Sequence, residues 1–178
     1  MSLLLSLKDD QYPYSGFQET RVVCRAILLN DENKIALHYL ERNDSFGVGN
    51  YYETPGGGLE KGESLEEAAI RECLEETGYC SISLGEIAQV NDAYNLIKRK
   101  NENHYFLLKT TAHQQKHFVS KGDLLIKQTV FVTIDEAIAL LENEAKTPIS
   151  KLVFAREYPI LVFLRDNWSL LLRNNLPL

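Results

Sequence analysis

Short apolar runs rich in β-branched residues alternate with polar, turn-forming segments along most of this chain. Runs of this length, bounded by Asn, Asp, Gly or Pro, are typical of β-strands. The pattern therefore predicts strands over residues 21–29, 34–40, 51–54, 81–90, 104–110 and 124–132. A turn over residues 30–33 makes the first two a hairpin. The remaining polar segments are predicted as loops or connections over residues 41–50, 91–103 and 111–123, the last with solvated His113 and His117.

Residues 65–77 carry the strongest helical pattern in the chain. Ser64 and Glu67 have the spacing of a capping box, which predicts that the helix begins just after Ser64. Gly78 suits the left-handed residue that often ends a helix, so the helix is predicted to end near Thr77. One broad face of this helix is predicted to pack inward, because it gathers Ala69, Ile70, Cys73, Leu74 and Thr77.

The C-terminal part of the chain also reads as helical. A second capping box, Thr133 with Glu136, predicts a helix over residues 134–141, and Pro148 suits the first turn of another. Pro159 interrupts the apolar spacing that follows, which predicts one kinked helix or two short ones. This apolar spacing is formed by Leu152, Val153, Ile160, Leu161, Phe163, Leu164 and Trp168. Hairpins mixed with helices predict an α/β fold of the α+β type, a mixed sheet with helices on both faces.

Length and composition narrow the class of protein. A chain of 178 residues suggests one domain, with an arm over residues 1–18, a core over 20–145 and a C-terminal helical segment over 147–170. The net charge of −6 argues against a nucleic-acid-binding surface, although metal ions can supply positive charge for a phosphate-bearing substrate. The three cysteines are interpreted as reduced thiols, which fits the cytoplasm. No run suits a secretion signal or a membrane span.

A second face of the 65–77 helix gathers the carboxylates of Glu72, Glu75 and Glu76 within an arc of about 100°. Carboxylates this close repel one another, which costs stability unless a hard cation with oxygen ligands binds them. The helical wheel alone leaves two interpretations open, a solvated acidic surface and a site for a divalent metal.

The spacing of residues around this helix resembles the Nudix box, Gly-x5-Glu-x7-Arg-Glu-U-x-Glu-Glu-x-Gly-U, in which U is a bulky apolar residue. Its fixed positions are filled here by Gly57, Glu63, Arg71, Glu72, Glu75, Glu76 and Gly78. At average residue frequencies such a match arises by chance at roughly one in 10⁸ start positions. The U positions hold Cys73 and Tyr79, where aliphatic residues are commoner. The motif resemblance covers residues 51–79, and the order of elements extends it over 20–145.

Resemblance to the MutT-like Nudix hydrolases implies an α/β/α sandwich that hydrolyses a nucleoside diphosphate linked to another moiety, such as a nucleoside triphosphate or ADP-ribose. It implies Mg²⁺, with Mn²⁺ as an alternative, held by Glu72, Glu75, Glu76 and the backbone carbonyl of Gly56. Arg71 and Glu63 are expected to orient the helix and its preceding loop, and Gly57 and Gly78 to serve the backbone of the motif. Many relatives place a further carboxylate before the last strand, so Asp123 is predicted to assist water or metal, with Glu53 as an alternative.

Substrate choice is weakly encoded. Phe46, Tyr51 and Tyr52 are candidates to stack on a nucleobase, and ordinary packing explains each of them equally well. Tyr94 lies at a position that matches neither the Pro of ADP-ribose-cleaving subfamilies nor the Tyr of dinucleoside-polyphosphate-cleaving ones. Two alternative classes stay open: a Nudix-fold module that binds a nucleotide without hydrolysis, and a diphosphate isomerase. The apolar stretch from Ile160 to Trp168 exceeds the needs of one helix face, which suggests a homodimer unless it covers the sheet.

Overall fold

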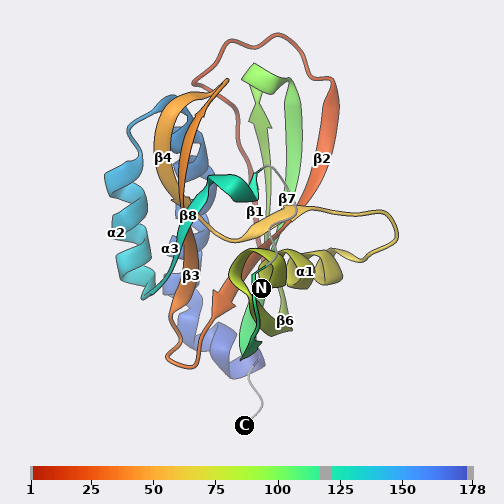
Figure 1. Ribbon diagram of the computed structural model, residues 1–178, viewed down its shortest axis with the longest axis vertical. Helices are drawn as coiled ribbons and strands as arrows, with labels where there is room; N and C mark the ends of the chain where they lie inside the picture. Colours follow the sequence, from red (N-terminus) through yellow and green to blue (C-terminus); the bar gives the residue numbers. More distant parts are fainter. Residues whose placement is uncertain (1, 117–121, 176–178) are drawn as a thin grey trace.

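The computed structural model describes residues 2–116 and 122–175, so the predicted loop residue His117 lies outside it. Within this part, eight strands form one mixed sheet in the order β1-β6-β7-β2-β3-β4, with β5 paired to β2 and β8 to β3 (Figure 1). The strands are β1 (Leu3–Ser6), β2 (Glu19–Leu29), β3 (Ile35–Asp44), β4 (Gly47–Glu53), β5 (Gly56–Gly58), β6 (Tyr79–Tyr94), β7 (Arg99–His113) and β8 (Ile126–Val132). The helices are α1 (Leu65–Thr77), α2 (Ile134–Glu144) and α3 (Pro148–Asn175), with short 3₁₀ helices η1 (Asn95–Ile97) and η2 (Asp123–Leu125).

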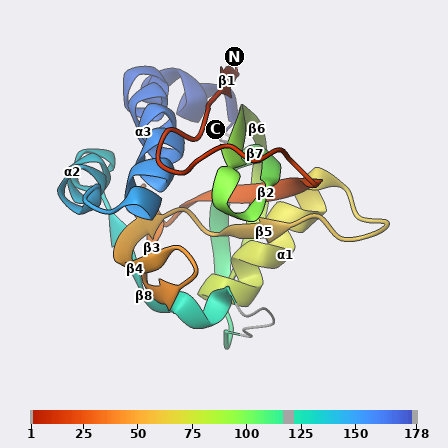
Figure 2. The same ribbon diagram turned by 90° about the horizontal axis from the view of Figure 1, so that it is seen from above.

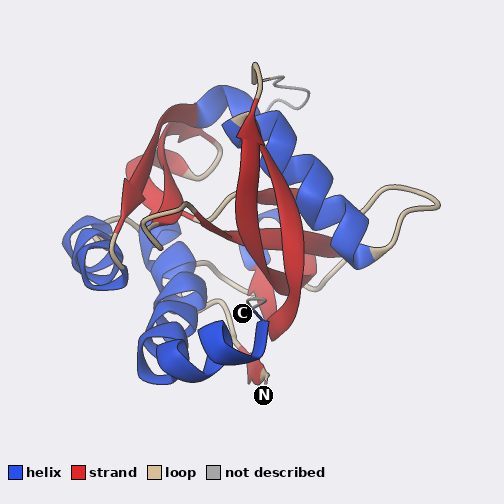
Figure 3. Cartoon of the chain, turned by 90° about the horizontal axis from the view of Figure 1, so that it is seen from below, coloured by secondary structure: helices blue, strands red, loops and turns tan. Residues whose placement is uncertain are grey.

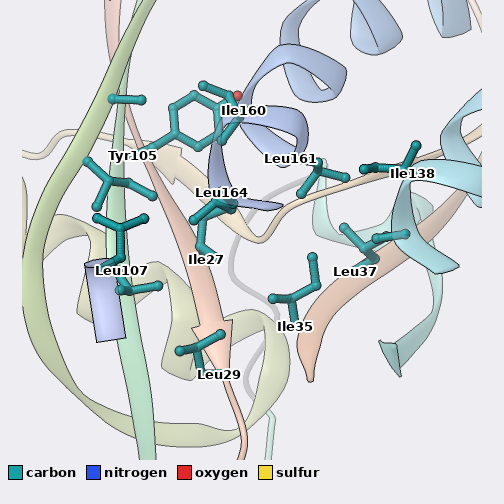
Figure 4. Close-up of a cluster of buried hydrophobic side chains, with 14 of the residues drawn as sticks. Ile27, Leu29, Ile35, Leu37, Tyr105, Leu107, Ile138, Ile160, Leu161 and Leu164 are labelled. Carbon is teal, nitrogen blue, oxygen red and sulfur yellow. The ribbon is translucent and has the colours of Figure 1, made fainter. Parts of the chain in front are cut away.

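The sheet lies between two helical layers, because the central strands are apolar on both faces. Alternate residues of a strand point to opposite faces. Along β2, Cys24, Ala26 and Leu28 pack with α1, whereas Ile27 and Leu29 pack in the larger cluster with α2 and α3 (Figure 4). Figures 2 and 3, from opposite sides, show α1 on one face and α2 with α3 on the other. The predicted mixed sheet with helices on both faces is therefore confirmed.

The helix starts follow the predicted caps. Ser64 accepts a hydrogen bond from the Glu67 N–H, and Gly78 ends α1 at a φ of 77° with its N–H bonded to the Leu74 carbonyl. Thr133 and Glu136 form the same reciprocal box at α2. Of the two alternatives left open at Pro159, the structure has one helix, α3, which continues through this residue. None of the helices in the described ranges is both long and apolar enough to cross a bilayer.

Several segments predicted as loops are strands, and those predictions are wrong. β3 pairs with β4 as far as Asp44 opposite Gly47, which leaves two residues for the turn within 41–50. β6 and β7 pair as far as Tyr94 opposite Arg99, within the predicted connection 91–103. Polar residues on these strands concealed them, because buried polar side chains interrupt the apolar pattern that predicts a strand. Hydrogen bonds compensate for the burial of these polar groups. The side-chain amides of Asn101 and Asn103, for example, both donate to Asp92.

Three further corrections concern segment ends. Within the predicted irregular arm, Leu3–Ser6 form β1, parallel to β6, because Leu3 and Leu5 pack on the core beside α3. The segment 55–58, whose proline and glycines predict a turn, contains a short strand over residues 56–58 that pairs with β2. The predicted loop over 111–123 loses its first residues to β7, which runs to His113.

The geometry of β2 and β3 creates the opening where the functional site lies. These two strands pair directly only at Leu29 and Ile35, next to their connecting turn. Farther from the turn β2 pairs instead with β5, through Val23, Cys24 and Arg25, while β3 pairs with β4 and β8. The sheet therefore splits into two wings above the core, and the box helix and β5 lie along one side of the split.

The apolar stretch of α3 is used within the chain. Ile160, Leu161 and Leu164 are fully buried against the sheet, and Phe163 and Trp168 are partly buried beside them (Figure 4). Covering the sheet therefore accounts for the pattern that suggested a homodimer.

Candidate functional site

The split between the two wings forms a cleft of about 490 Å³, lined by residues of β2, β3, β4, β5, α1, β7, η2 and α3. Of the residues that the sequence singled out, the cleft brings together Phe46, Tyr51, Glu53, Gly56, Gly57, Arg71, Glu72, Glu75, Glu76 and Asp123. Tyr52 is not among them. Its ring lies 5.1 Å from the Tyr39 ring and packs against the main core, whereas its neighbour Tyr51 lines the cleft.

Glu76 is the most firmly held of the three carboxylates on α1. Its side chain is 8% exposed, against 12% for Glu72 and 23% for Glu75. The Gly56 N–H donates to Glu76 Oε2 at 2.8 Å. Gly56 adopts a φ of 151°, and a Cβ atom there would overlap the Cys24 carbonyl and the Arg25 backbone. Glycine at this position therefore lets β5 come close enough to hold Glu76.

His38 supplies the second contact to Glu76. It lies buried on β3, and its Nε2 is 3.2 Å from the same Glu76 Oε2. Its Nδ1 is 3.0 Å from Thr129 Oγ1, which accepts a 2.9 Å hydrogen bond from Lys116 Nζ. A lysine ammonium only donates. All three contacts are therefore hydrogen bonds when the Thr129 hydroxyl donates to Nδ1 and the imidazole proton is on Nε2. Glu76 then accepts two hydrogen bonds through one oxygen, which leaves the other for a ligand.

Sequence reasoning did not single out His38. The signal was a lone histidine in the apolar strand 34–40, two residues from Ala36. Because Ala36 packs in the α1 cluster, the alternation of strand side chains directs His38 toward the same helix.

Arg71 ties the start of the box to its helix. It donates to Glu63 through Nε at 3.0 Å and Nη2 at 2.7 Å, and Nη2 also reaches the Gly58 carbonyl at 3.0 Å. Nη1 contacts Glu72 at 2.9 Å and Glu75 at 3.3 Å. The paired bonds with Glu63 are the main reason that the pKa of Arg71 lies above its usual range. Glu63 lies outside the cleft lining and contacts it through this arginine and through the Glu60 N–H, which donates to Glu63 at 2.6 Å.

The carboxylates of Glu72 and Glu75 are electrostatically strained, as their spacing on the helix predicts. Burial raises the pKa of Glu72 to about 7, with Arg71 opposing the shift and the charges of Glu76 and Glu75 adding to it. Burial also raises the pKa of Glu75; Arg71 opposes this shift, and Asp123 adds to it. One arginine therefore does not neutralise this cluster, and a further positive charge would relieve it.

The donor set suits a hard divalent cation. Carboxylate and carbonyl oxygens are the ligands that Mg²⁺ takes in proteins. The absence of a side chain at Gly57 makes room for Glu72, since a Cβ atom there would overlap its carboxylate. Within residues 2–116 and 122–175, no three carboxylate, imidazole or thiol groups already converge as a metal cluster. Arg71 bridges Glu72 and Glu75 in this conformation. Glu72, Glu75 and Glu76 are the residues that would hold the cation.

A buried ion network joins the floor of the cleft to α3. Glu53 Oε2 accepts from Arg156 Nη2 at 2.6 Å and from Arg25 Nη1 at 3.3 Å, and Arg156 also contacts Glu157 at 2.9 Å. Burial alone would raise the pKa of Glu53, but Arg25 and Arg156 outweigh it and lower the pKa. The sequence signal for this network was Arg25, a charged residue between the buried apolar residues Cys24 and Ala26. The helix beyond the box thus contributes charged residues to the site.

Asp123 enters the cleft from the opposite side. It is buried at the first position of η2, just before β8. Its charge acts on Glu75, so the two carboxylates lie in one electrostatic environment.

The fold and the cleft together define an α/β/α protein that presents a row of carboxylates from one helix to an arginine-lined pocket. Comparisons with known proteins agree with this class. A family model described as "NUDIX domain" matches residues 19–153. The chain therefore belongs to the Nudix family of hydrolases.

One curated relative is a putative 8-oxo-dGTP diphosphatase of Bacillus subtilis (strain 168), 38% identical over 88 residues. The match covers 49% of this chain and 52% of the relative, so the chain spans about half the length of that protein. Two solved structures share the fold. The MutT protein from Methanosarcina mazei Go1 has a TM-score of 0.59 at 20% identity, covering 86% of this chain and 99% of that one. A NUDIX hydrolase from Nitrosomonas europaea has a TM-score of 0.55 at 22% identity, covering 79% and 88%.

Proposed function

We propose that this protein is a divalent-metal-dependent pyrophosphohydrolase that cleaves a phosphoanhydride bond in a nucleoside diphosphate linked to another moiety. The observation that carries the proposal is the row of Glu72, Glu75 and Glu76 on the cleft side of α1, with burial and mutual repulsion raising the pKa of Glu72 to about 7. A bound Mg²⁺ or Mn²⁺ would neutralise charge on the phosphate groups and help to activate water.

The chain's own residues have separate tasks in this proposal. Glu76, held by Gly56 and His38, would fix the position of the cation, and Glu72 and Glu75 would supply two further carboxylate ligands. Arg71 holds these two carboxylates and the loop before the helix in register. The Gly56 carbonyl stays a predicted fourth ligand. The Phe46 ring lines the cleft, makes edge-to-face contacts with the rings of Tyr12 and Tyr94, and is proposed to contact a nucleobase.

Asp123 is proposed to hold the attacking water or to assist the metal, because it is buried across the cleft from α1. Asp123→Asn keeps the size of the side chain and removes its charge. We expect a lower kcat with KM nearly unchanged, measured across the pH range. Full kcat at every pH would assign the role to another group, with Glu53 next in line.

The decisive test is a hydrolysis screen with Mg²⁺ over nucleoside triphosphates (8-oxo-dGTP among them), ADP-ribose, NDP-sugars and dinucleoside polyphosphates. Glu76→Gln should leave the protein folded and reduce kcat on the confirmed substrate by roughly 10²-fold or more, since one ligand of a charge-stabilising cation is weakened. The melting temperature of the wild type should rise with Mg²⁺ or Mn²⁺, and that of the variant should rise less. Equal turnover of Glu76→Gln, or full activity in excess chelator, would refute the metal dependence, whereas no hydrolysis of any substrate in the screen would favour a nucleotide-binding module.

Two further parts of the proposal concern the protein's setting. The free cysteines Cys24, Cys73 and Cys80 suit a reducing compartment, which supports a cytoplasmic location. A homodimer stays a prediction, and a monomer mass in light scattering at micromolar concentration would remove it.

A further inference from the structure

The cleft contains two arginines whose charge no carboxylate balances closely. Six arginines line it: Arg21, Arg25, Arg42, Arg71, Arg99 and Arg156. Four of them are committed to partners. Arg25 and Arg156 bind Glu53, Arg42 binds Asp44 at 2.6 Å, and Arg71 binds the box carboxylates. Arg21 and Arg99 are different.

Among the described residues, the Arg21 guanidinium makes no side-chain hydrogen bond or ion pair. Burial, followed by the charges of Arg99 and Arg25, lowers the pKa of Arg21. The Nε of Arg99 is buried without a hydrogen-bond partner, and the nearest carboxylate in this part of the chain is that of exposed Glu19, at 3.9 Å. Arg21 is exposed in the cleft and Arg99 is partly buried, and an anionic ligand would relieve the mutual repulsion of the two guanidinium groups.

Strand register explains why these arginines meet. β2 and β7 are parallel neighbours, with Glu19 opposite Arg99 and Arg21 opposite Asn101. Arg99 and Asn101 are two residues apart on one strand, so they point to the same face as Arg21. The Asn101 amide donates to Asp92, while its Oδ1 is buried without a partner. Arg99 Nε, a donor, and Asn101 Oδ1, an acceptor, are therefore both buried without a hydrogen-bond partner in the described part of the chain.

The arginine pair lies next to the carboxylate row. A Cβ atom at Gly58 would meet Arg21 Nη2 at 2.7 Å, whereas the space beside Gly57 is filled by the Glu72 carboxylate. Successive residues of a strand face opposite sides, so β5 is flanked by Glu72 on one side and Arg21 on the other. Both residues nevertheless line the same cleft, so a phosphate chain that passes β5 within the cleft can contact both groups.

We propose that Arg21 and Arg99 form a phosphate subsite that binds the terminal phosphate of a nucleoside triphosphate, next to the phosphates held at the carboxylates. Guanidinium groups bind phosphate oxygens in a bidentate manner through parallel N–H donors. This inference rests on the proposed hydrolase function and names its substrate class. An NDP-sugar has no third phosphate for this subsite, so nucleoside triphosphates are the preferred substrates.

The test compares kcat/KM for a nucleoside triphosphate and for an NDP-sugar with the same base, in Arg21→Gln and Arg99→Gln. Each variant should lower the triphosphate value by about 10- to 100-fold, the effect of one charge-assisted hydrogen-bond pair. Each should change the NDP-sugar value by less than about threefold, within the range of substitutions that remove no contact to the substrate, because an NDP-sugar places no phosphate at this subsite. Arg21→Lys, which keeps the charge but not the fork, should fall between wild type and Arg21→Gln.

Lys100→Gln is the matched control. It removes the same charge from the same strand, but Lys100 is exposed and lies over the Phe17 ring on the opposite face of β7. It should leave both substrates unchanged. Equal losses on both substrates in the arginine variants, or a control that behaves like them, would overturn the subsite.

Binding of inorganic tripolyphosphate in excess chelator, measured by calorimetry, tests the subsite without turnover. Weaker binding to Arg21→Gln than to Lys100→Gln supports the subsite even if the screen finds no hydrolysis, in which case only the proposed function fails. Equal binding to both overturns it.

Discussion

Replacing His38 tests whether a residue outside the box controls the metal site. In His38→Leu, Glu76 Oε2 keeps the Gly56 N–H at 2.8 Å and loses the imidazole at 3.2 Å. The leucine also leaves the Thr129 hydroxyl without its ring partner. Glu76 is then held at one point, and its carboxylate can rotate away from Glu72 and Glu75.

The size of the effect follows from the bond that is lost. A hydrogen bond to an ionised group contributes roughly 1.5–3 kcal/mol, and loss of a residue that orients a metal ligand costs about 10–100-fold in metal affinity. We therefore expect the Mn²⁺ dissociation constant of His38→Leu to rise by about 10–100-fold. Because the cation carries the proposed chemistry, kcat at subsaturating metal should fall in parallel and recover in part at high metal concentration.

The assay is Mn²⁺ binding followed by electron paramagnetic resonance, together with kcat at a series of metal concentrations. His38→Gln keeps an N–H donor for Glu76 and should restore most of the affinity, which a purely structural role would not predict. His104→Leu is a matched control, because His104 pairs with Glu86 at 2.6 Å outside the cleft lining. Wild-type Mn²⁺ affinity in a folded His38→Leu protein would refute the reasoning.

Two other predictions concern Glu53 and Gly57. Because Arg25 and Arg156 outweigh burial and lower the pKa of Glu53 from 4.5, ionised Glu53 adds stability that is present above pH 4.5 and lost as pH falls through the lower folded pKa. The gap in melting temperature between wild type and Glu53→Gln should therefore be full at neutral pH and shrink below pH 4.5; a constant gap would contradict this. Gly57→Ala places a methyl group where the Glu72 carboxylate lies. Calorimetry should therefore show weaker Mg²⁺ binding, with the metal-free melting temperature nearly unchanged. Unaltered binding would show that Glu72 moves freely.

Local signals explain how much of the site the sequence could predict. The start, end and acidic face of α1 depend on residues within one or two helical turns of one another, so capping and helical spacing identify them. His38 and Glu76 are 38 positions apart, and His38 and Thr129 are 91 apart. No periodicity within one segment connects residues at such separations. The contacts of His38 with Glu76 and Thr129 therefore appear only in the folded chain.

Strand register set a second limit. The sequence identified a strand ending before Pro55 and two adjacent tyrosines on it, but composition does not decide which one faces the cleft. A shift of one residue moves every side chain of a strand to the other face. The pairing of β4 with β3 turns Tyr51 toward the cleft and Tyr52 toward Tyr39 and the core.

One face of two neighbouring strands forms both the core and the proposed ligand site. On β2, Arg21, Val23 and Arg25 line the cleft, and Ile27 and Leu29 continue the same face into the core. On β7 the matching face also changes from polar to apolar. Arg99, Asn101 and Asn103 line the cleft, and Tyr105 and Leu107 lie in the core.

The change from polar to apolar residues occurs where the apolar side chains of α3 pack over these strands. Ile160 and Leu164 lie over the apolar half, and one turn before Ile160 the helix presents Arg156 to the cleft instead. Where α3 covers the strands with apolar side chains, the face stabilises the fold. Where β2 and β3 separate and that cover ends, the same alternation leaves arginine and asparagine side chains facing an open cleft. Their charge lies beside the carboxylates of α1, and a metal-bound polyphosphate would satisfy both groups at once.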